Sequence, residues 1–442
     1  MVKIEITHLR VIWWMAEGLR IGVFSDTHIG RNIPRVLRDA RRKAFRHAFK
    51  QAIDIFIESD VDYVIHAGDL FEKRSMTPDD AVFVKWEFYR LAKKIEERSG
   101  KKIEIIAVRG NHDGSPLSSA LDFITHPMAE YFKVIGEKTL EGVEEAYVGD
   151  GLNVIGMGYH PYARRKFEEA SEILKKVEAD GYRILLLHNY VEAVHDIPPQ
   201  TPEHSVIRLE DLERLDVDLV ITGHHHERLG FKKTGGKLFL IPGATEAIDL
   251  GERGPFGVYI LDVEKSGLIS HKFVELEPLQ VIGVRRVVSD KPVELDWFRR
   301  RCLEEIESFA LNLDRDGILK LNVSGVVAGD EPFPQLGLQE EVQKLMERYD
   351  KLIHVEVSED LSSMIRPDVK GVEGRISRDE IVREVFGVLG ERAGEAAEIV
   401  EDVAMALDEK ASERTGLLKE LDRRKFSDRW LRFLSSYVGE GS

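Results

Sequence analysis

Short apolar runs alternate with longer amphipathic stretches between residues 19 and 263. The apolar runs are rich in β-branched and aliphatic residues, which is typical of strands. They cover residues 20–24, 63–65, 103–108, 154–157, 184–187, 219–221 and 238–241. Between them, residues 36–59 and 80–97 carry apolar side chains at helical spacing and are long enough to cover a sheet. The alternation predicts a layered α/β domain in which helices flank β-sheets.

The pattern changes after residue 263. Strand-like stretches at 280–289, 317–326 and 351–357 alternate with helical ones at 296–309 and 339–349, which predicts a small α+β domain. From about residue 377 the pattern is almost wholly helical to the end. We therefore predict three parts: an α/β core over 1–265, an α+β domain over 266–365 and a helical region over 366–442.

Composition narrows the class of protein. No apolar run approaches the roughly 18 residues that span a bilayer, and no signal-peptide pattern opens the chain, so we expect a soluble, cytoplasmic protein without a membrane partner. Residues 1–14 precede a second methionine, Met15, and we expect them to be dispensable or a start-site extension. The single cysteine, Cys302, leaves no disulfide and no cysteine-based metal site. A metal would have to be held by His, Asp, Glu or Asn.

The net charge of −16 argues against a uniformly basic surface that would coat nucleic acid. Arginine and lysine nevertheless crowd residues 31–46, beginning with Arg31 and Arg35. Charge alone favours a solvated helix face for this segment.

A polar cluster follows each of five predicted strands. The clusters are SDTHIG at 25–30, AGDLFE at 67–72, RGNHD at 109–113, LLLHNY at 185–190 and TGHHHER at 222–228. In open α/β sheets, ligands bind outside the carboxyl ends of the strands, so we expect the clusters to converge on one crevice. Oxygen ligands and imidazoles without sulfur suit manganese, iron or zinc. A lone histidine is usually a core or surface residue, but five clusters in this order predict a centre of two metals.

Spacing suggests how side chains share such a centre. Asp69 is the natural bridge because a carboxylate has two oxygens. Asp26 and His28 stand two residues apart and can reach one ion on an extended chain, and His224 and His226 can do the same from the opposite side.

The remaining clusters add further donors. Asn111 supplies a carbonyl oxygen and His188 another imidazole, which leaves His112 as a candidate proton donor. Alternation along an extended chain predicts that His225 points away from its two neighbours. We expect His66 to pack beneath the site.

These motifs resemble the calcineurin-like metallophosphoesterase superfamily. The forms SDTHIG, AGDLFE and GNHD are most similar to its DNA double-strand break repair nuclease branch, which includes the archaeal and eukaryotic meiotic recombination eleven nucleases and bacterial SbcD. The match covers about residues 20–245. The resemblance implies a nuclease core, a capping domain and a C-terminal helical segment that binds an SMC-like ABC ATPase. It also implies a homodimer formed through helices that flank the core.

The resemblance further implies a manganese-dependent DNA exonuclease or endonuclease that processes duplex ends, hairpins and single strands in double-strand break repair, nucleoid-associated in a prokaryote. Mg²⁺, Fe²⁺ or Zn²⁺ could replace Mn²⁺. One ion would be held by Asp26, His28, Asp69 and His226, and the other by Asp69, Asn111, His188 and His224. His224 and His226 thus serve different ions. His112 would stabilise the transition state or protonate the leaving group, while a metal-activated water attacks phosphorus in line.

One position departs from the branch. Its archaeal and eukaryotic members commonly carry a histidine three residues after the bridging aspartate, where this chain has Glu72. This difference bears on the balance of exonuclease and endonuclease activity. At the rim of the crevice, we expect DNA contacts from Arg31, Arg35, Glu72, Lys73 and Arg74.

The C-terminal region carries an apolar and aromatic face. It could pack on the preceding helices, or it could dock the ATPase subunit that the resemblance implies. We expect the docking contacts at Leu421, Phe426, Trp430, Phe433 and Leu434.

Two alternatives compete with the nuclease interpretation. One is a phosphoesterase acting on nucleotides or cyclic phosphodiesters. Protein phosphatases of the superfamily are disfavoured, because they carry GDxVDRG and GNHE where this chain has GDLFEKR and GNHD. The other is a DNA-end scaffold that tethers the ATPase and has only secondary nuclease activity.

Overall fold

The computed structural model describes residues 18–363, apart from 116–117, 129, 140–141, 145, 175–180 and 330–333, together with 399, 402–403, 426–427 and 429–430. The chain divides into two compact units, Met1–Met364 and Ile365–Ser442. Residues 1–14 and most of the predicted helical region over 366–442 therefore lie outside the described residues. Within the described part of the chain, no helix is both long enough and apolar enough to cross a membrane.

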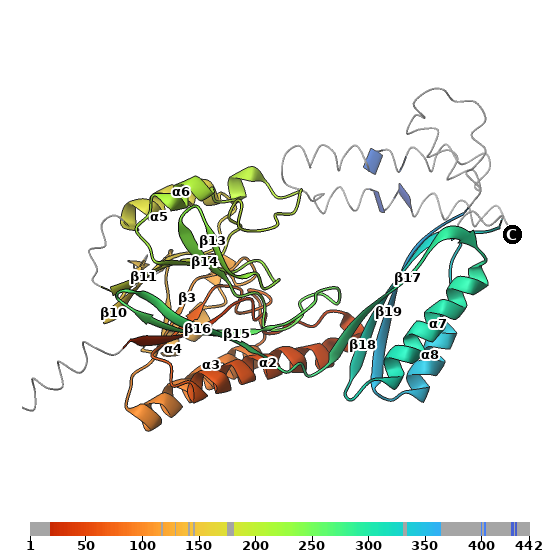
Figure 1. Cartoon of the computed structure of the whole chain (residues 1–442), viewed down its shortest axis with the longest axis horizontal. Helices are drawn as coiled ribbons and strands as arrows, with labels where there is room; N and C mark the ends of the chain where they lie inside the picture. The colour runs from red at the N-terminus through yellow and green to blue at the C-terminus, as the bar shows by residue number, and fades with distance from the viewer. Residues whose placement is uncertain are drawn as a thin grey trace, which may run out of the picture. The chain divides into compact units, whose positions relative to one another are not determined.

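Two six-stranded sheets form the core of the first unit (Figure 1). The first, in the order β16-β15-β1-β2-β3-β6, contains β1 (Leu19–Phe24), β2 (Tyr63–His66), β3 (Glu104–Ala107), β6 (Phe132–Val134), β15 (Gly257–Glu264) and β16 (Gly267–Glu275). The second, in the order β13-β14-β12-β11-β10-β9, contains β9 (Ala146–Val148), β10 (Gly151–Met157), β11 (Gly181–Leu187), β12 (Leu219–Thr222), β13 (Gly230–Thr234) and β14 (Lys237–Ile241). All seven strands predicted for the core are present.

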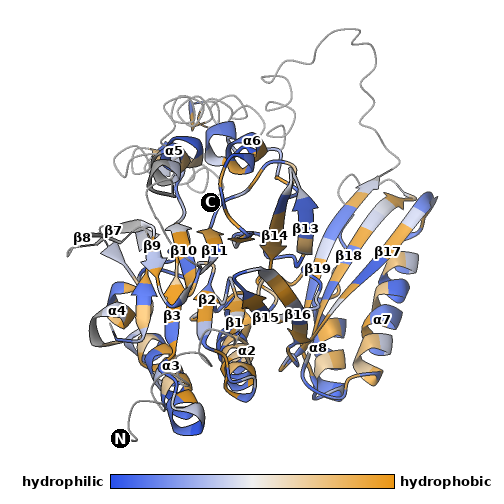
Figure 2. Cartoon of the chain, turned by 60° about the vertical axis from the view of Figure 1, so that its left-hand side comes forward, coloured by the Kyte–Doolittle hydropathy of each residue, from blue (hydrophilic) through white to orange (hydrophobic). Residues whose placement is uncertain are grey.

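Helices cover the outer face of each sheet, and the inner faces pack on each other. The first sheet is covered by α2 (Arg38–Glu58), α3 (Pro78–Ser99) and α4 (Asp122–Met128), the second by α5 (Ala163–Leu174) and α6 (Leu209–Glu213). Phe45, Phe49 and Phe56 are fully buried because their spacing places them on one face of α2. Between the sheets lie buried aliphatic residues such as Val23 and Leu186, and the strands carry orange hydrophobic positions in Figure 2. The predicted layered α/β core is confirmed.

A smaller domain, residues 281–363, alternates strands and helices. Its three strands β17 (Val281–Val293), β18 (Gly317–Val327) and β19 (Leu352–Ser363) are parallel. The connecting helices α7 (Leu295–Leu311) and α8 (Gln339–Arg348) lie on one face of this sheet (Figure 1). Buried side chains such as Phe298 and Cys302 fill the interface between sheet and helices. The single cysteine is therefore a core residue.

Strand pairing continues past residue 265, where we predicted the end of the core domain. Strands β15 and β16 form an antiparallel hairpin in which Gly257 pairs with Glu275. Residue 265 lies in the turn of that hairpin, so the boundary would cut β16 from its sheet. The core therefore continues to Glu275. Only the pairing of the two strands reveals where it ends.

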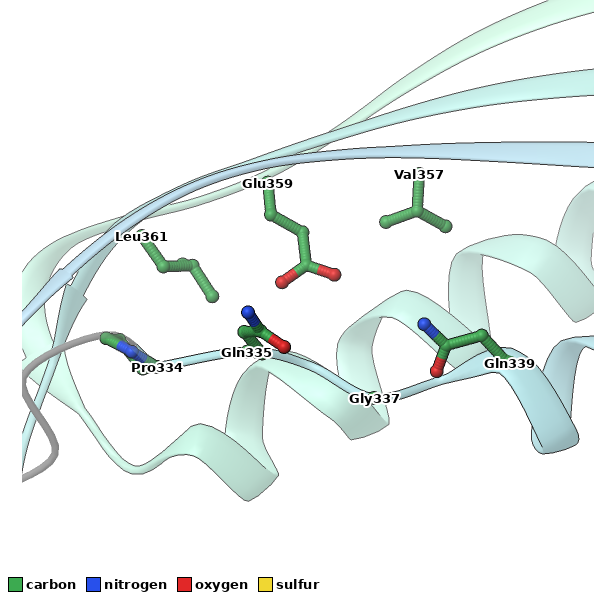
Figure 3. A pocket seen from close by; sticks show the side chains of 7 residues that line it. All are labelled: Pro334, Gln335, Gly337, Gln339, Val357, Glu359 and Leu361. Carbon is green, nitrogen blue, oxygen red and sulfur yellow. The ribbon is translucent and has the colours of Figure 1, made fainter. Parts of the chain in front are cut away.

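A surface pocket of about 440 Å³ lies in this smaller domain (Figure 3). It is lined by Pro334, Gln335, Gly337, Gln339, Val357, Glu359 and Leu361. The carboxylate of Glu359 accepts a hydrogen bond of 2.9 Å from the backbone N–H of Leu336. None of the predicted ligands lines this pocket, so the candidate chemistry lies elsewhere.

Candidate metal centre

The carboxyl ends of strands from both sheets bring six of the seven predicted ligands into two groups. The candidate ligand atoms of Asp26, His28 and His226 lie within 4.8 Å of one another, and those of Asp69, His188 and His224 do the same. The first group joins the loops after β1 and β12, and the second joins those after β2, β11 and β12. The seventh predicted ligand, Asn111, lies in the loop after β3 with an exposed side chain.

Asp69 stands between the two groups. Its Oδ2 lies 3.7 Å from Nε2 of His28 and 3.2 Å from Nε2 of His188, so one carboxylate oxygen faces a histidine of each group. Asp26, His28, Asp69 and His188 are buried, whereas His224 and His226 are only partly so. The centre is therefore closed beneath and open on the side of the TGHHHER loop.

Three histidines share one hydrogen-bonding arrangement. Nδ1 of His28 lies 3.0 Å from a Glu72 carboxylate oxygen, Nδ1 of His188 lies 2.6 Å from the Ala67 carbonyl, and Nδ1 of His226 lies 2.8 Å from a carboxylate oxygen of Glu252. Because these oxygens can only accept, Nδ1 carries the proton and Nε2 keeps its lone pair. Nε2 of His28 and of His188 are buried without a hydrogen-bond partner. Metal-ligating histidines have this arrangement, so the donor set fits divalent ions.

The electrostatics around Asp69 favour positive charge on His188, whereas burial, and then the charge of His188, lower the pKa of His224 to about 3. Burial raises the pKa of the Asp69 carboxyl, but the neighbouring His188 and His28 outweigh it and hold this pKa far below its usual range. Burial lowers the pKa of His188, but the Asp69 carboxylate outweighs that effect and raises it above its ordinary value. A site that stabilises charge on a buried imidazole also stabilises a cation.

The backbone is strained at four of the predicted ligands. Asp26, His28, Asp69 and His224 have φ angles of 49°, 40°, 54° and 74°, in the left-handed region that side chains rarely adopt. Each costs on the order of 1 kcal/mol relative to ordinary geometry. The backbone N–H of Asp26 donates to the Gly68 carbonyl at 3.0 Å, which helps hold the turn in place. Strain of this kind is concentrated at functional sites.

Two glycines beside the predicted ligands leave room for the side chains of other ligands. A Cβ added to Gly68 would lie 2.2 Å from Nδ1 of His188, and one added to Gly110 would lie 2.0 Å from Oδ1 of Asp69. Both distances are far below van der Waals contact. The glycine in each GD and GN pair is therefore required for the groups to approach each other.

His112 is positioned through both its backbone and its ring. Its backbone N–H donates to Oδ1 of Asp69 at 2.8 Å, and its Nδ1 lies 2.9 Å from the carbonyl oxygen of Glu72. Its ring centroid is 4.7 Å from that of His28. Since Nδ1–H donates its hydrogen bond to the carbonyl, Nε2 is the nitrogen left for a substrate.

Asp113 has a structural role that the sequence did not reveal. Its fully buried carboxyl accepts backbone hydrogen bonds from Gly110 and Phe71 at 2.9 Å and from Leu70 at 3.3 Å. Burial, and then the charge of Asp69, raise its pKa. Asp113 thereby ties the loops after β2 and β3 together beneath the site. The GNHD motif placed it beside the ligands, but only packing shows what it binds.

His66 and His225 lie outside both groups. His66 is buried, with Nε2 3.2 Å from the Thr27 hydroxyl, and burial lowers its pKa to about 3, so it packs as a neutral residue. The ring of His225 lies 5.4 Å from that of His195, centroid to centroid.

Two of the predicted DNA contacts, Arg31 and Glu72, are buried in the structure. Arg31 is 7% exposed and Glu72 5%, and they form an ion pair at 2.9 Å. Neither side chain is therefore presented to solvent. Arg35, Lys73 and Arg74 are exposed, and their contacts with DNA stay predictions.

Much of the basic segment 31–46 is also neutralised within the protein. Arg41 is fully buried against Glu246, and Arg42 and Arg46 both pair with Asp80 at the start of α3. The sequence did not predict these ion pairs, because the acidic partners are distant along the chain.

The sequence matches the calcineurin-like phosphoesterase family over residues 19–228, the segment that supplies all the side chains of the two groups. Residues 19–228 therefore form a domain of the calcineurin-like metallophosphoesterases. Within them the chain is similar to the DNA double-strand break repair protein Mre11, which confirms the predicted resemblance. The protein of Thermoplasma acidophilum is 29% identical over 60% of this chain and 67% of its own length. That of Methanococcus maripaludis is 27% identical over 64% and 72%.

Among solved structures, a dimetal phosphatase from Danio rerio aligns with 59% of this chain and 99% of its own, at 11% identity and a TM-score of 0.34. A likeness at this level adds nothing to the family match.

Proposed function

We propose that this protein is a metal-dependent DNA nuclease that processes DNA ends in double-strand break repair. The observation that carries the proposal is the pair of ligand groups around Asp69, in a domain whose relatives are named DNA double-strand break repair proteins. A centre for two ions suits phosphodiester hydrolysis, in which both the attacking and the leaving oxygen develop charge.

We assign one Mn²⁺ to Asp26, His28, Asp69 and His226. A second Mn²⁺ belongs to Asp69, Asn111, His188 and His224. Asp69 is shared because Oδ2 faces a histidine of each group. When bound, the ions would act as Lewis acids and lower the pKa of a water molecule that attacks phosphorus.

His112 serves as the proton donor to the leaving oxygen. Donation of its Nδ1 proton to the Glu72 carbonyl fixes the ring, and Nε2 takes up and releases the transferred proton. The exposed Lys73, Arg74 and Arg35 offer cations to the phosphates of the DNA.

The protein forms a homodimer through α3. Val82, Trp86 and Tyr89 stand at helical spacing on this helix and are 61%, 67% and 42% exposed. Trp86 and Tyr89 stack with centroids 5.8 Å apart, which presents one flat apolar surface. Such a stripe on an exposed helix is typical of a contact between subunits.

The C-terminal region binds an SMC-like ABC ATPase. Phe426 and Trp430, two of the predicted contacts, are helical and half-buried. They stand four residues apart and therefore share one face of a helix. Leu421, Phe433 and Leu434 lie outside the described residues.

The nuclease proposal is tested with end-labelled duplex and hairpin DNA in the presence of Mn²⁺. The wild type degrades the DNA, His112→Ala does not, and His271→Ala, which replaces an exposed histidine on β16, retains full activity. Circular dichroism checks that each variant is folded. Hydrolysis of mononucleotides or generic phosphomonoesters without cleavage of DNA would overturn the proposal.

A further inference from the structure

Arg31 is a buried cation that holds two segments of the core together. Its Nη1 donates to both carboxylate oxygens of Glu72, at 2.9 and 3.0 Å. Its Nε donates to the carbonyl of Ile248 at 2.6 Å, and its Nη2 to Asp249 at 2.9 Å. The guanidinium thus joins the loop after β2 to the segment 246–252 that follows β14.

Each of these two segments carries a carboxylate that orients a histidine. Glu72 accepts from Nδ1 of His28 at 3.0 Å, and Glu252 accepts from Nδ1 of His226 at 2.8 Å. The same Glu72 carboxylate pairs with the Arg31 guanidinium, whose Nη1 donates to both of its oxygens. Glu72 is therefore an ionised acceptor, as a ligating histidine requires of its outer partner.

Arg31 also reaches Glu252 through a single residue. Ile248 donates its N–H to the Glu252 carboxylate at 2.7 Å, while its carbonyl accepts from Arg31. The segment is further fixed by Leu250, which packs in a small buried cluster with Leu37. A shift of Arg31 would therefore displace the carboxylates of both Glu72 and Glu252.

Both oriented histidines belong to the same ligand group, Asp26–His28–His226. The other group depends on a different support, because His188 donates to the backbone carbonyl of Ala67 at 2.6 Å. Among the hydrogen bonds and ion pairs of the described residues, none joins Arg31 to His188 or His224. Arg31 therefore supports the group of Asp26, His28 and His226 but not the other group.

We infer that Arg31 is a positioning residue for one half of the centre, setting His28 through Glu72 and His226 through Glu252. This inference rests on the proposed two-metal function. Loss of Arg31 weakens the ion held by Asp26, His28 and His226 and leaves the ion held by Asp69, His188 and His224 in place. Removal of such outer partners typically lowers metal affinity about 10- to 100-fold.

The test counts Mn²⁺ ions in the full chain by calorimetric titration and by the electron paramagnetic resonance of free and bound Mn²⁺. The wild type binds two ions. Arg31→Met binds one ion with unchanged affinity and the second at least about tenfold more weakly. The spin-coupled signal of a Mn²⁺ pair is lost from this variant at ion concentrations that saturate the wild type. Arg31→Lys, which keeps a charge beside Glu72, restores part of the affinity.

Two further variants keep the test decisive. Arg46→Met is the matched control, because Arg46 pairs with Asp79 and Asp80 and has no bond to the centre; it binds two ions like the wild type. If Arg31→Met does not fold, Glu72→Gln takes its place, since the amide still accepts from His28 but lacks the charge; it also weakens one ion selectively.

The outcomes distinguish the positioning role of Arg31 from the proposed nuclease function. Two ions of unchanged affinity in both Arg31→Met and Glu72→Gln would overturn the inference, as would equal weakening of both ions. A wild type that binds two ions but does not cut DNA would overturn the proposed function and leave the positioning role intact. A wild type that binds no Mn²⁺ would overturn both.

Discussion

Gly110 lies so close to Asp69 that a single methyl group could not fit between them, since an added Cβ would stand 2.0 Å from the Oδ1 of Asp69. The same oxygen accepts the backbone N–H of His112. The proposed bridging carboxylate and the proposed proton donor are thus set by one contact that only glycine permits.

Gly110→Ala is therefore expected to displace Asp69. We expect a loss of stability of about 1–3 kcal/mol from overpacking and at least tenfold weaker Mn²⁺ binding. Gly100→Ala is the control, because Gly100 has a φ of 72° but open space around it, so it costs only about 1 kcal/mol of strain. Denaturant unfolding and Mn²⁺ titration measure the two effects. Normal binding by Gly110→Ala would contradict the proposed role of Asp69.

Alanine substitutions of the three consecutive histidines should differ in their effects on metal binding and DNA cleavage. His224→Ala and His226→Ala each remove a proposed ligand from a different group, and we expect each to bind one Mn²⁺ fewer and to lose DNA cleavage. His225→Ala should change stability by only about 0.5 kcal/mol and keep activity, since His225 belongs to neither group. Severe loss of metal from His225→Ala would reverse this assignment.

Trp86→Glu should convert a dimer to a monomer. The change places a charge in the middle of the apolar stripe on α3, where burial against a second copy would be unfavourable. Light scattering coupled to size-exclusion chromatography gives the mass of each form. Phe123→Glu, which alters another exposed aromatic residue on α4, is the control and should leave the mass unchanged. A monomeric wild type would refute the proposed interface.

Truncation after Ser412 should abolish co-purification with the ATPase subunit. The truncation removes the proposed aromatic docking face, including Phe426 and Trp430, and spares the nuclease core. Nuclease activity without the partner should therefore be unchanged, which serves as the internal control. Undiminished binding of the ATPase would place the partner site elsewhere.

His195 should make stability depend on pH below neutrality. Burial, and then the charge of His225, lower its pKa from 6.5 to about 3, so the folded protein holds this ring neutral. Between these values the unfolded chain binds a proton that the folded protein does not, so the free energy of unfolding falls as the pH falls. The slope reaches up to ~1.4 kcal/mol per pH unit for one such group.

Replacement of this ring should flatten that dependence. His195→Gln keeps an acceptor for the backbone N–H of Val191, which now bonds to Nδ1 at 2.9 Å, but it cannot titrate. Urea unfolding between pH 6.5 and pH 4.5 compares the slopes of the two proteins. An identical slope would show that His195 is not the titrating group.

The pattern of apolar and polar residues was sufficient to predict the core strands and the clusters that follow them. Alternating apolar runs give strands whichever neighbours they find, and the carboxyl ends of parallel strands meet at one edge of a sheet. For that reason Asp26 and Asp69, whose strands pair in parallel, could be expected in one crevice, which His188 reaches from the second sheet. The glycine before Asp69 is likewise visible in the motif.

Which charged side chains are paired inside the protein could not be predicted without the fold. Arg31 seemed a surface cation because its partners are remote: Glu72 is 41 residues away and Ile248 is 217. Glu252 gave no signal in the sequence, since an acidic residue in a loop is usually solvated. Burial and pairing depend on which segments the fold brings together. A local pattern of residues therefore predicts where ligands stand, but not what holds them in place.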